Sequence, residues 1–271
     1  MSADLHAASP IGDGGAKPSQ TIATVERAID VLMLFTRVRA PHLGVTEIAN
    51  ELGMSKAAVH RILSSLRGKG LLEVHEELRR YSLGPATLAL GLSYLERLDV
   101  RDVAANELAG LCDATGETAT LSIRSGDTRT YVSQVTPDAE VKMTVPLGRP
   151  FPLHTGSSSK AFLAFLADEE IERYITRPLE RLTDSTITDP DHLRADLRRI
   201  RKAGYATSFG ERQEGAASVA APVFDHSGRP AAVISVCGPI ERFRGEADGA
   251  ARLLLEATTR LSARMGYSGA A

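Results

Sequence analysis

One stretch of the chain, residues 53–72, has a charge pattern suited to binding nucleic acid. It holds four Lys or Arg residues and no Asp or Glu, although the 271-residue chain has a net charge of -2. Apolar residues recur in it at helical spacing and must face a core, which turns a basic face of small and polar residues to solvent. Arginine there can bond guanine in the major groove, while lysine and serine hold phosphates. The candidate DNA contacts are Ser55, Lys56, Ala57, His60, Arg61, Ser64 and Arg67.

The alternative for this stretch is a charged helix face that contacts only water. Such a face normally carries acidic residues as well as basic ones. Because the stretch has none, the sequence favours DNA binding.

A second stretch, His154 to Lys160, contains residues that could perform acyl transfer. Ser157 and Lys160 have the SxxK spacing in which a lysine activates a serine nucleophile. The sequence lacks the SDN and KTG segments that accompany this motif in penicillin-binding enzymes, since residues 202–204 are only a loose echo. His154 has no paired acid in view, so we expect it to bond the loop backbone. A serine hydrolase stays the alternative function, and we expect the chain not to be an enzyme.

The sequence gives little support for a metal site, a disulfide framework or a membrane span. The seven histidines have no HxxxH or HxH spacing, so neither a metal site nor a cofactor is predicted. Cys112 and Cys237 lack the CxxC spacing, which argues against a thiolate zinc site or a disulfide framework. No run approaches the roughly 18 apolar residues of a membrane span. We therefore expect a cytoplasmic protein without a membrane partner.

Length and composition fit a globular protein of two domains, at roughly 100 to 200 residues per domain. Hydrophobic residues are 43% of the chain and charged residues 24%, which is ordinary for globular proteins. Residues 1–20 have no apolar period and are expected to be a disordered leader. Residues 21–84 read as a DNA-binding domain, 85–99 as a linker helix and 100–271 as a second domain.

Three helices are predicted to open the first domain. The first covers residues 24–37 and is expected to turn Val25, Ile29 and further apolar residues at the same spacing toward the core. Thr46 and Ser55 are the candidate N-caps of the second and third helices.

A hairpin and an apolar helix follow these helices. Residues 71–75 and 79–83 alternate apolar and polar residues, which indicates a β-hairpin wing. Arg79 and Arg80 on this wing could grip the phosphate backbone or the minor groove. The helix over 85–99 has apolar residues on two stripes, so a second subunit could cover one of them. An ordinary buried helix is the alternative.

The second domain is predicted to be an α+β sandwich with a largely antiparallel sheet. A turn of small polar residues at 154–160 leads into a helix whose N-terminus could bind an anion. Helices are expected near 103–113, 157–166, 190–203 and 246–265, and strands at 118–124, 130–135, 141–147, 219–224 and 231–237.

Several short segments together carry a resemblance to a known family. In the first domain they are residues 26–32, 46–49, 52–56, 59–63 and 81–84. Downstream they are residues 153–154, 160–161, 204–206, 214–215, 220–225, 235–239 and Arg242. Each segment is a weak motif alone, but in this order and spacing the chain resembles the IclR family of bacterial transcriptional regulators.

This resemblance implies a winged helix-turn-helix joined by a linker helix to a GAF-like effector-binding domain. It implies a sequence-specific regulator, with repressor favoured over activator, that binds a palindromic operator in double-stranded DNA as a homodimer or homotetramer. A small organic effector, such as a carboxylate metabolite, would modulate operator binding. Carried over by position, the effector pocket would be lined by Met143, Gly156, Ser157, Ser158, Ser208, Ser218, Ser235 and Cys237.

Two of these positions depart from the family pattern. Ser208 stands where members that bind short oxo-acids carry Asp, and Ser218 stands where members often carry Cys. A ring of hydroxyl groups suits a neutral polar or amide ligand as well as a carboxylate, so the effector stays open.

Overall fold

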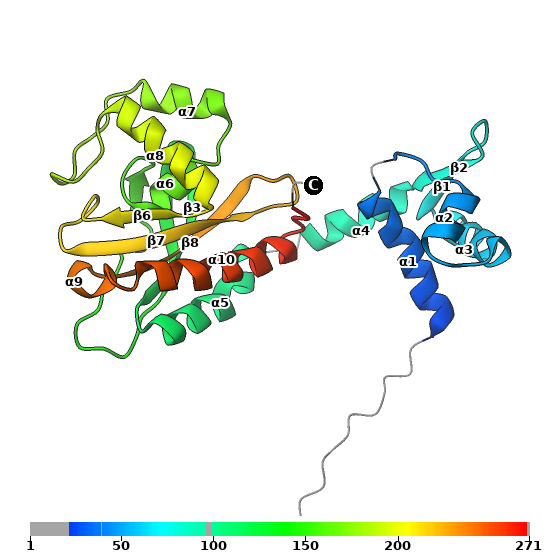
Figure 1. The fold of residues 1–271 in the computed structure, drawn as a ribbon, viewed down its shortest axis with the longest axis horizontal. Coiled ribbons are helices and arrows are strands. Elements are labelled where there is room, and N and C mark those ends of the chain that lie inside the picture. The colour runs from blue at the N-terminus through cyan, green and yellow to red at the C-terminus, as the bar shows by residue number, and fades with distance from the viewer. Residues whose placement is uncertain (1–21, 39, 96–98, 270–271) are drawn as a thin grey trace, which may run out of the picture. The chain divides into compact units, whose positions relative to one another are not determined.

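The computed structural model describes residues 22–38, 40–95 and 99–269. The chain divides into two compact units, Met1–Arg97 and Leu98–Ala271, each described here by itself (Figure 1). The predicted leader, residues 1–20, lies outside the described residues.

The first unit consists of helices followed by an antiparallel hairpin and a further helix. The hairpin pairs Leu72 with Leu83 and His75 with Arg80. This order of elements is that of a winged helix-turn-helix. Its elements are α1 (Ala23–Arg37), α2 (Val45–Glu51), α3 (Lys56–Gly68), β1 (Leu72–His75), β2 (Arg80–Leu83) and α4 (Pro85–Leu95).

The core of this unit differs from the prediction at α1. Val31 and Leu34 are buried, whereas Val25 and Ile29 are 51% and 52% exposed. These two residues lie on a side of α1 that no other described element of the unit covers, so their predicted burial was wrong. The apolar stripe of α3 is buried as predicted, through Val59, Ile62, Leu63 and Leu66.

The helix caps were predicted in part. The Ser55 hydroxyl accepts a hydrogen bond from the Ala58 N–H at 3.2 Å, which confirms this N-cap. The N-cap of α2 is Gly44 rather than Thr46. The Glu47 carboxylate reaches back to accept from the Gly44 N–H at 2.9 Å, which satisfies a donor at the helix start.

The linker helix begins at Pro85 as predicted, and its described part ends at Leu95. Residues 96–98 lie outside the described residues. Asp99, the last residue of the predicted linker helix, has extended backbone and is the N-cap of the next helix.

The second unit is built on a six-stranded antiparallel sheet in the order β5-β4-β3-β8-β7-β6. Its strands are β3 (Thr118–Ser125), β4 (Thr128–Val135), β5 (Pro150–Pro152), β6 (Ala206–Phe209), β7 (Ala216–Phe224) and β8 (Pro230–Pro239). Its helices are α5 (Val100–Thr115), α6 (Ser157–Leu163), α7 (Asp168–Ile175), α8 (Pro190–Ala203), α9 (Ile240–Phe243) and α10 (Ala247–Arg264).

Helices cover both faces of this sheet. Val219 and Ala221 of β7 belong to the core beneath α5 and α10, whereas Ala220 between them belongs to the core beneath α6, α7 and α8 (Figure 1). Successive residues of a strand point to opposite faces, so β7 contributes to both cores. The result is the three-layer α+β arrangement of a GAF-like domain.

The predicted strand at 141–147 was wrong, because this segment is a loop. The Gln134 side chain bonds both backbone groups of Val145, at 3.0 and 3.2 Å, and the Thr118 hydroxyl donates to the Met143 carbonyl at 2.6 Å. Side chains thus replace a strand partner for these backbone groups.

Candidate functional site

The outer face of α3 is a basic surface. Val59, Ile62, Leu63 and Leu66 hold the opposite face of the helix against the core of the first unit. Small side chains on the outer face leave room for close approach of a partner. All the predicted contact residues are exposed there, namely Ser55, Lys56, Ala57, His60, Arg61, Ser64 and Arg67.

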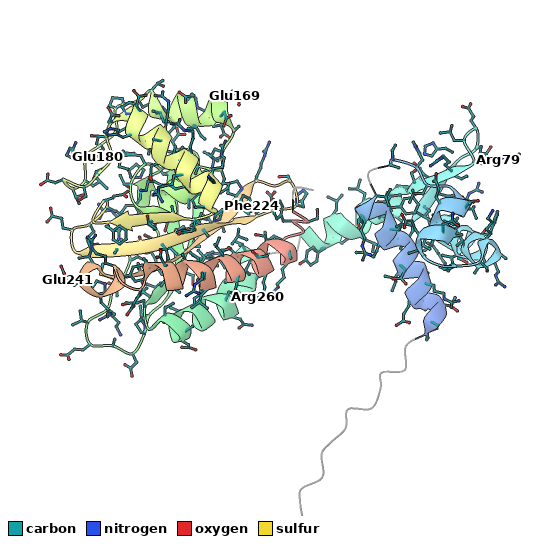
Figure 2. The ribbon with its side chains drawn as sticks, in the orientation of Figure 1. Arg79, Glu169, Glu180, Phe224, Glu241 and Arg260 are labelled. Atoms are coloured by element: carbon teal, nitrogen blue, oxygen red, sulfur yellow. The ribbon has the colours of Figure 1, made fainter. Side chains whose placement is uncertain are left out.

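The two wing arginines have different surroundings. Arg80 donates to the Glu47 carboxylate at 2.6 Å and to the His42 carbonyl at 3.1 Å, so it ties the hairpin to the start of α2. Arg79 is exposed at the hairpin turn, with a left-handed φ of 50° (Figure 2). Within the described residues no partner engages its side chain, so its guanidinium group is available to a ligand.

A cavity in the second unit brings together most of the predicted effector residues. Its volume of about 20 Å³ has room for about one water molecule. Ser235 is not among its lining residues, because its hydroxyl bonds Thr120 Oγ1 at 2.6 Å within the sheet. The predicted residues that do line it are Met143, Gly156, Ser157, Ser158, Ser208, Ser218 and Cys237.

The cationic wall of this cavity was not predicted from the sequence. Arg129 of β4 is only 1% exposed, and its guanidinium group donates to Ser159 Oγ at 2.9 Å and to the Tyr131 hydroxyl at 3.0 Å. A longer bond of 3.4 Å reaches Ser122 Oγ. Burial is the main reason that the pKa of Arg129 is lowered, and the nearby Arg212 guanidinium lowers it further. The signal in the sequence was an arginine two residues before a tyrosine on a strand, so that both point to one face.

Cys237 lines the same cavity as a protonated thiol. Burial raises the pKa of Cys237 to about 12, and Arg212 and Arg129 oppose that shift only in part. The cavity therefore has a thiol, hydroxyls and guanidinium groups on its walls. Among its described lining residues there is no Asp or Glu.

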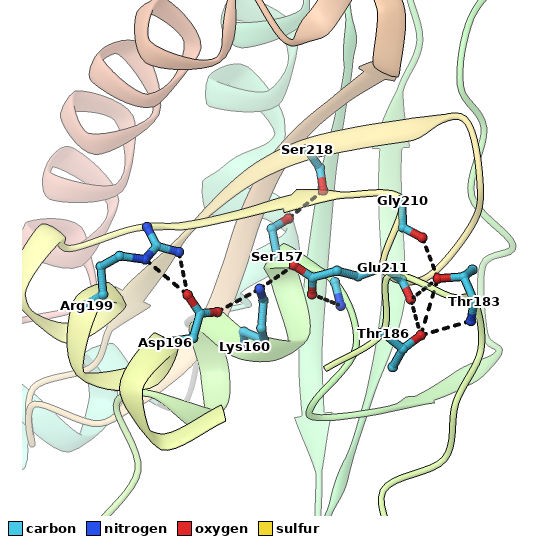
Figure 3. Close-up of polar contacts among 10 residues, drawn as sticks. Ser157, Lys160, Thr183, Thr186, Asp196, Arg199, Gly210, Glu211 and Ser218 are labelled. Atoms are coloured by element: carbon cyan, nitrogen blue, oxygen red, sulfur yellow. Dashed lines mark hydrogen bonds and ion pairs between the residues drawn. The ribbon is translucent and has the colours of Figure 1, made fainter. Parts of the chain in front are cut away.

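The SxxK residues do not form a nucleophile and base pair. Lys160 is buried, and its Nζ donates to Asp196 at 2.8 Å and to Glu211 at 2.5 Å (Figure 3). The Ser157 hydroxyl instead shares a hydrogen bond of 2.7 Å with the Ser218 hydroxyl (Figure 3). The lysine is therefore committed to two carboxylates.

Glu211 joins this ion cluster to the loop before α6. Its second carboxylate oxygen accepts from the Gly156 N–H at 3.3 Å. Burial raises the pKa of Glu211, while Lys160 opposes that rise. Asp196 is also partly buried, but Lys160 and Arg199 outweigh the burial and lower its pKa. The cluster thereby fixes one wall of the cavity.

His154 bonds a backbone carbonyl, but of the segment after α7 rather than of its own loop. Its Nε2 lies 2.8 Å from the Glu180 carbonyl and its Nδ1 lies 2.9 Å from the Tyr174 hydroxyl. Because the Glu180 carbonyl can only accept, Nε2 carries a proton, and Nδ1 of the neutral imidazole accepts from the Tyr174 hydroxyl, which itself accepts from the Leu153 N–H. Burial lowers the pKa of His154 and raises that of Tyr174 to about 12.

The described residues offer neither a cluster of metal ligands nor a membrane-spanning helix. Over residues 22–38, 40–95 and 99–269, no three His, Cys, Asp or Glu side chains gather closely enough to hold a metal ion. No helix in the same ranges combines the length and apolar character needed to cross a membrane.

Two family models match the chain. One describes the IclR helix-turn-helix domain and matches residues 24–76. The other describes the C-terminal domain of bacterial IclR transcriptional regulators and matches residues 92–263.

Individual proteins are similar over most of their length. The HTH-type transcriptional regulator BhcR of Paracoccus denitrificans is 37% identical over 232 residues, covering 85% of this chain and 82% of that protein. The transcriptional repressor IclR of Escherichia coli is 30% identical over 203 residues, covering 74% of each. The crystal structure of Pseudomonas aeruginosa HmgR aligns with a TM-score of 0.80 at 32% identity, covering 92% of this chain and all of that one.

Proposed function

The chain belongs to the IclR family of bacterial transcriptional regulators, and from this premise we propose how its two units divide the work. It is a DNA-binding regulator of transcription, a class of protein rather than an enzyme family. The first unit reads the operator, and the second binds a small effector that changes operator affinity.

The exposed, acid-free face of α3 carries this proposal. In a helix-turn-helix the second helix enters the major groove, and α3 occupies that place in the chain. Arg61 is assigned to a guanine, because arginine can bond O6 and N7 together. Arg79 is assigned to phosphate or the minor groove, whereas Arg80 holds the wing through Glu47. The other residues assigned to bases or phosphates are Ser55, Lys56, Ala57, His60, Ser64 and Arg67.

A homodimer on a palindromic operator fits the apolar surface of α4. Leu88, Leu90 and Leu92 are 65%, 64% and 50% exposed, which is unusual for leucines on one short helix. A second copy of the chain would bury them and place two α3 helices on two half-sites. A homotetramer would pair two such dimers. The assembly works in the bacterial cytoplasm, where the DNA is.

The cavity beside Ser157 and Ser158 is the proposed effector site. A ligand shifts an equilibrium only by binding one arrangement better than another. We assign that role to arrangements of the paired first units, with α4 as the element that transmits the change. A ligand that weakens operator binding makes the protein a repressor relieved by its effector, which is the mode we favour.

The experiment is binding of the purified protein to promoter fragments from its own genomic neighbourhood, with unrelated DNA as competitor. Binding to one fragment that survives the competitor and falls linearly in log affinity with log salt supports the proposal. If unrelated DNA displaces every fragment equally, the assignment of α3 to operator reading is wrong.

A further inference from the structure

The effector cavity is positively charged on one side, and no described lining residue balances that charge. We propose that it takes a short dicarboxylate, with Arg129 binding one carboxylate and Arg212 the other. This inference rests on the proposed function, because it names the chemical class of the effector for the same cavity.

Arg129 is a buried cation with only neutral partners. Its guanidinium group has five N–H donors, and the hydroxyls of Ser159, Tyr131 and Ser122 accept three hydrogen bonds from it. Two donors are therefore left without a hydrogen-bond partner among the described residues, on a side chain that lines the cavity. A charge removed from water is stabilised well only by an opposite charge in good hydrogen-bonding geometry. Within the described residues no carboxylate pairs with Arg129, so the opposite charge has to come from a ligand.

Lys160 is a second buried cation of the same unit, and its role is structural. It is as buried as Arg129, and two carboxylates, Asp196 and Glu211, accept hydrogen bonds from its Nζ. The two residues lie on neighbouring parts of the fold, since Ser159, which accepts from Arg129, directly precedes Lys160. Arg129 differs from Lys160 by facing the cavity without an acid.

Arg212 supplies the second positive charge. Its Cζ lies 5.1 Å from the centre of the Phe151 ring, and the Cζ of Arg129 lies 4.9 Å from the same centre. Two guanidinium groups gathered on one ring repel each other, and the proximity of Arg212 lowers the pKa of Arg129. A ligand with two negative charges would convert this repulsion into two attractions.

The remaining walls suit carboxylate oxygens that the arginines do not bind. Ser158 and Ser208 line the cavity, and hydroxyls donate readily to carboxylates. Because the cavity has room for about one water molecule, a ligand must displace a side chain on entry. Arg212 is half-buried whereas Arg129 is fully buried, so Arg212 is the side chain that moves.

The test measures direct binding by isothermal titration calorimetry to the full chain. The dianionic probes are malonate, succinate and glutarate, the monoanionic probe is butyrate, and the neutral probe is succinamide. We expect the preferred dicarboxylate to bind at least about 10-fold tighter than butyrate, because a second charge-assisted hydrogen-bonding site is worth at least this factor. Succinamide should bind more weakly than either.

Two variants separate the roles of the arginines. Arg212→Met should reduce the affinity for the preferred dicarboxylate to within about 2-fold of that for butyrate, since only the Arg129 carboxylate site is left. Arg129→Met should abolish binding of both probes, and Arg129→Lys should restore part of it by restoring the charge. Arg198→Met is the matched control, because Arg198 is an exposed arginine on α8. It should bind every probe as the wild type does.

Three results would overturn the inference. These are equal affinity for butyrate and for the tightest-binding of the three dicarboxylates, tightest binding of succinamide, and no binding of any of the three dicarboxylates. Operator binding by the same preparations distinguishes this failure from failure of the proposed function. A protein that binds its operator, and releases it with succinamide, is an effector-regulated repressor with a neutral ligand.

Discussion

Two buried cations of the second unit, Lys160 and Arg129, are stabilised by different partners. Lys160 has Asp196 and Glu211, whereas Arg129 has hydroxyl groups and aromatic rings. The difference separates a structural role from a ligand-binding one. The SxxK spacing places Lys160 one helical turn after Ser157, but the Lys160 ammonium group binds two carboxylates instead of the serine hydroxyl.

A substitution at Lys160 tests this structural role. Lys160→Met should lower the free energy of unfolding by about 3 to 5 kcal/mol, because two carboxylates lose their buried partner. Urea denaturation of wild type and variant measures the loss. Lys202→Met on α8 is the control, since Lys202 is exposed and should change stability little. Equal stability of the two variants would contradict a structural role and would reopen the hydrolase hypothesis.

The stability of the second unit should depend on pH through His154. Burial lowers the pKa of His154 in the folded protein below its ordinary value of 6.5. The stabilising contribution is therefore complete above pH 6.5. As the pH falls below that value, the unfolded chain binds a proton that the folded chain does not, and stability decreases until the folded pKa is reached.

The measurement compares urea denaturation from about pH 7.5 to about pH 5.5, the range in which histidine titrates. His154→Gln keeps a donor for the Glu180 carbonyl but cannot be protonated, so it should lose less stability over this range than the wild type does. A variant that loses as much as the wild type would show that His154 does not cause the acid sensitivity.

Single residues of the cavity were only partly predictable. The serine-rich wall follows from the family resemblance position by position, and it lies at the start of α6 and on β6 and β7. Arg129 could not be found in this way, since arginines in strands are usually exposed. Its burial depends on Phe151 and Ser159, which pack against it from β5 and α6.

At the scale of elements, long periodic segments and the tight β1–β2 hairpin were predictable, whereas the short strands β5 and β6 were not. The helices predicted near 190–203 and 246–265 match α8 and α10 closely, and α8 is capped by Asp189 and Gly204. β5 and β6 have three and four residues, too few to show an alternating pattern. The segment at 141–147 alternates like a strand, but side chains of β3 and β4 hold it as a loop.

The exposed apolar side chains on α1 and those on α4 escape prediction for the same reason. Amphipathic spacing predicts that apolar residues are covered, but it does not tell whether the same chain covers them. Ile29 on α1 and Leu88 on α4 are exposed in this unit. We therefore expect both helices to meet a second copy.

Substitutions on α4 test the proposed dimer. Leu88→Glu combined with Leu92→Glu should shift the protein toward a monomer in sedimentation equilibrium, because charges would be buried in the apolar contact. Operator affinity should fall with dimer stability, since one half-site contributes less than two. Ser93→Glu on the same helix is the control for added charge. A wild type that sediments as a monomer while bound to its operator would contradict the dimer.

At the scale of the whole molecule, function requires coupling between the two units. The family resemblance predicts both units and their order, and the fold has both. Sequence cannot give the size of the coupling, because it depends on how a ligand changes the balance between arrangements of the dimer. Thermodynamic linkage nevertheless fixes one property of any effector, namely its affinity for the operator-bound protein. A compound that weakens operator binding must itself bind the operator complex more weakly, by the same factor.

The central claim is that the exposed face of α3 reads the operator, and Arg61→Ala tests it most directly. Specific operator affinity at fixed salt should fall by about 1 to 3 kcal/mol, which is roughly 5-fold to 150-fold, because a bidentate contact to a base is lost. Affinity for unrelated DNA should change much less, and Arg198→Ala should bind both DNAs as the wild type does. Wild-type operator affinity of Arg61→Ala would contradict the account.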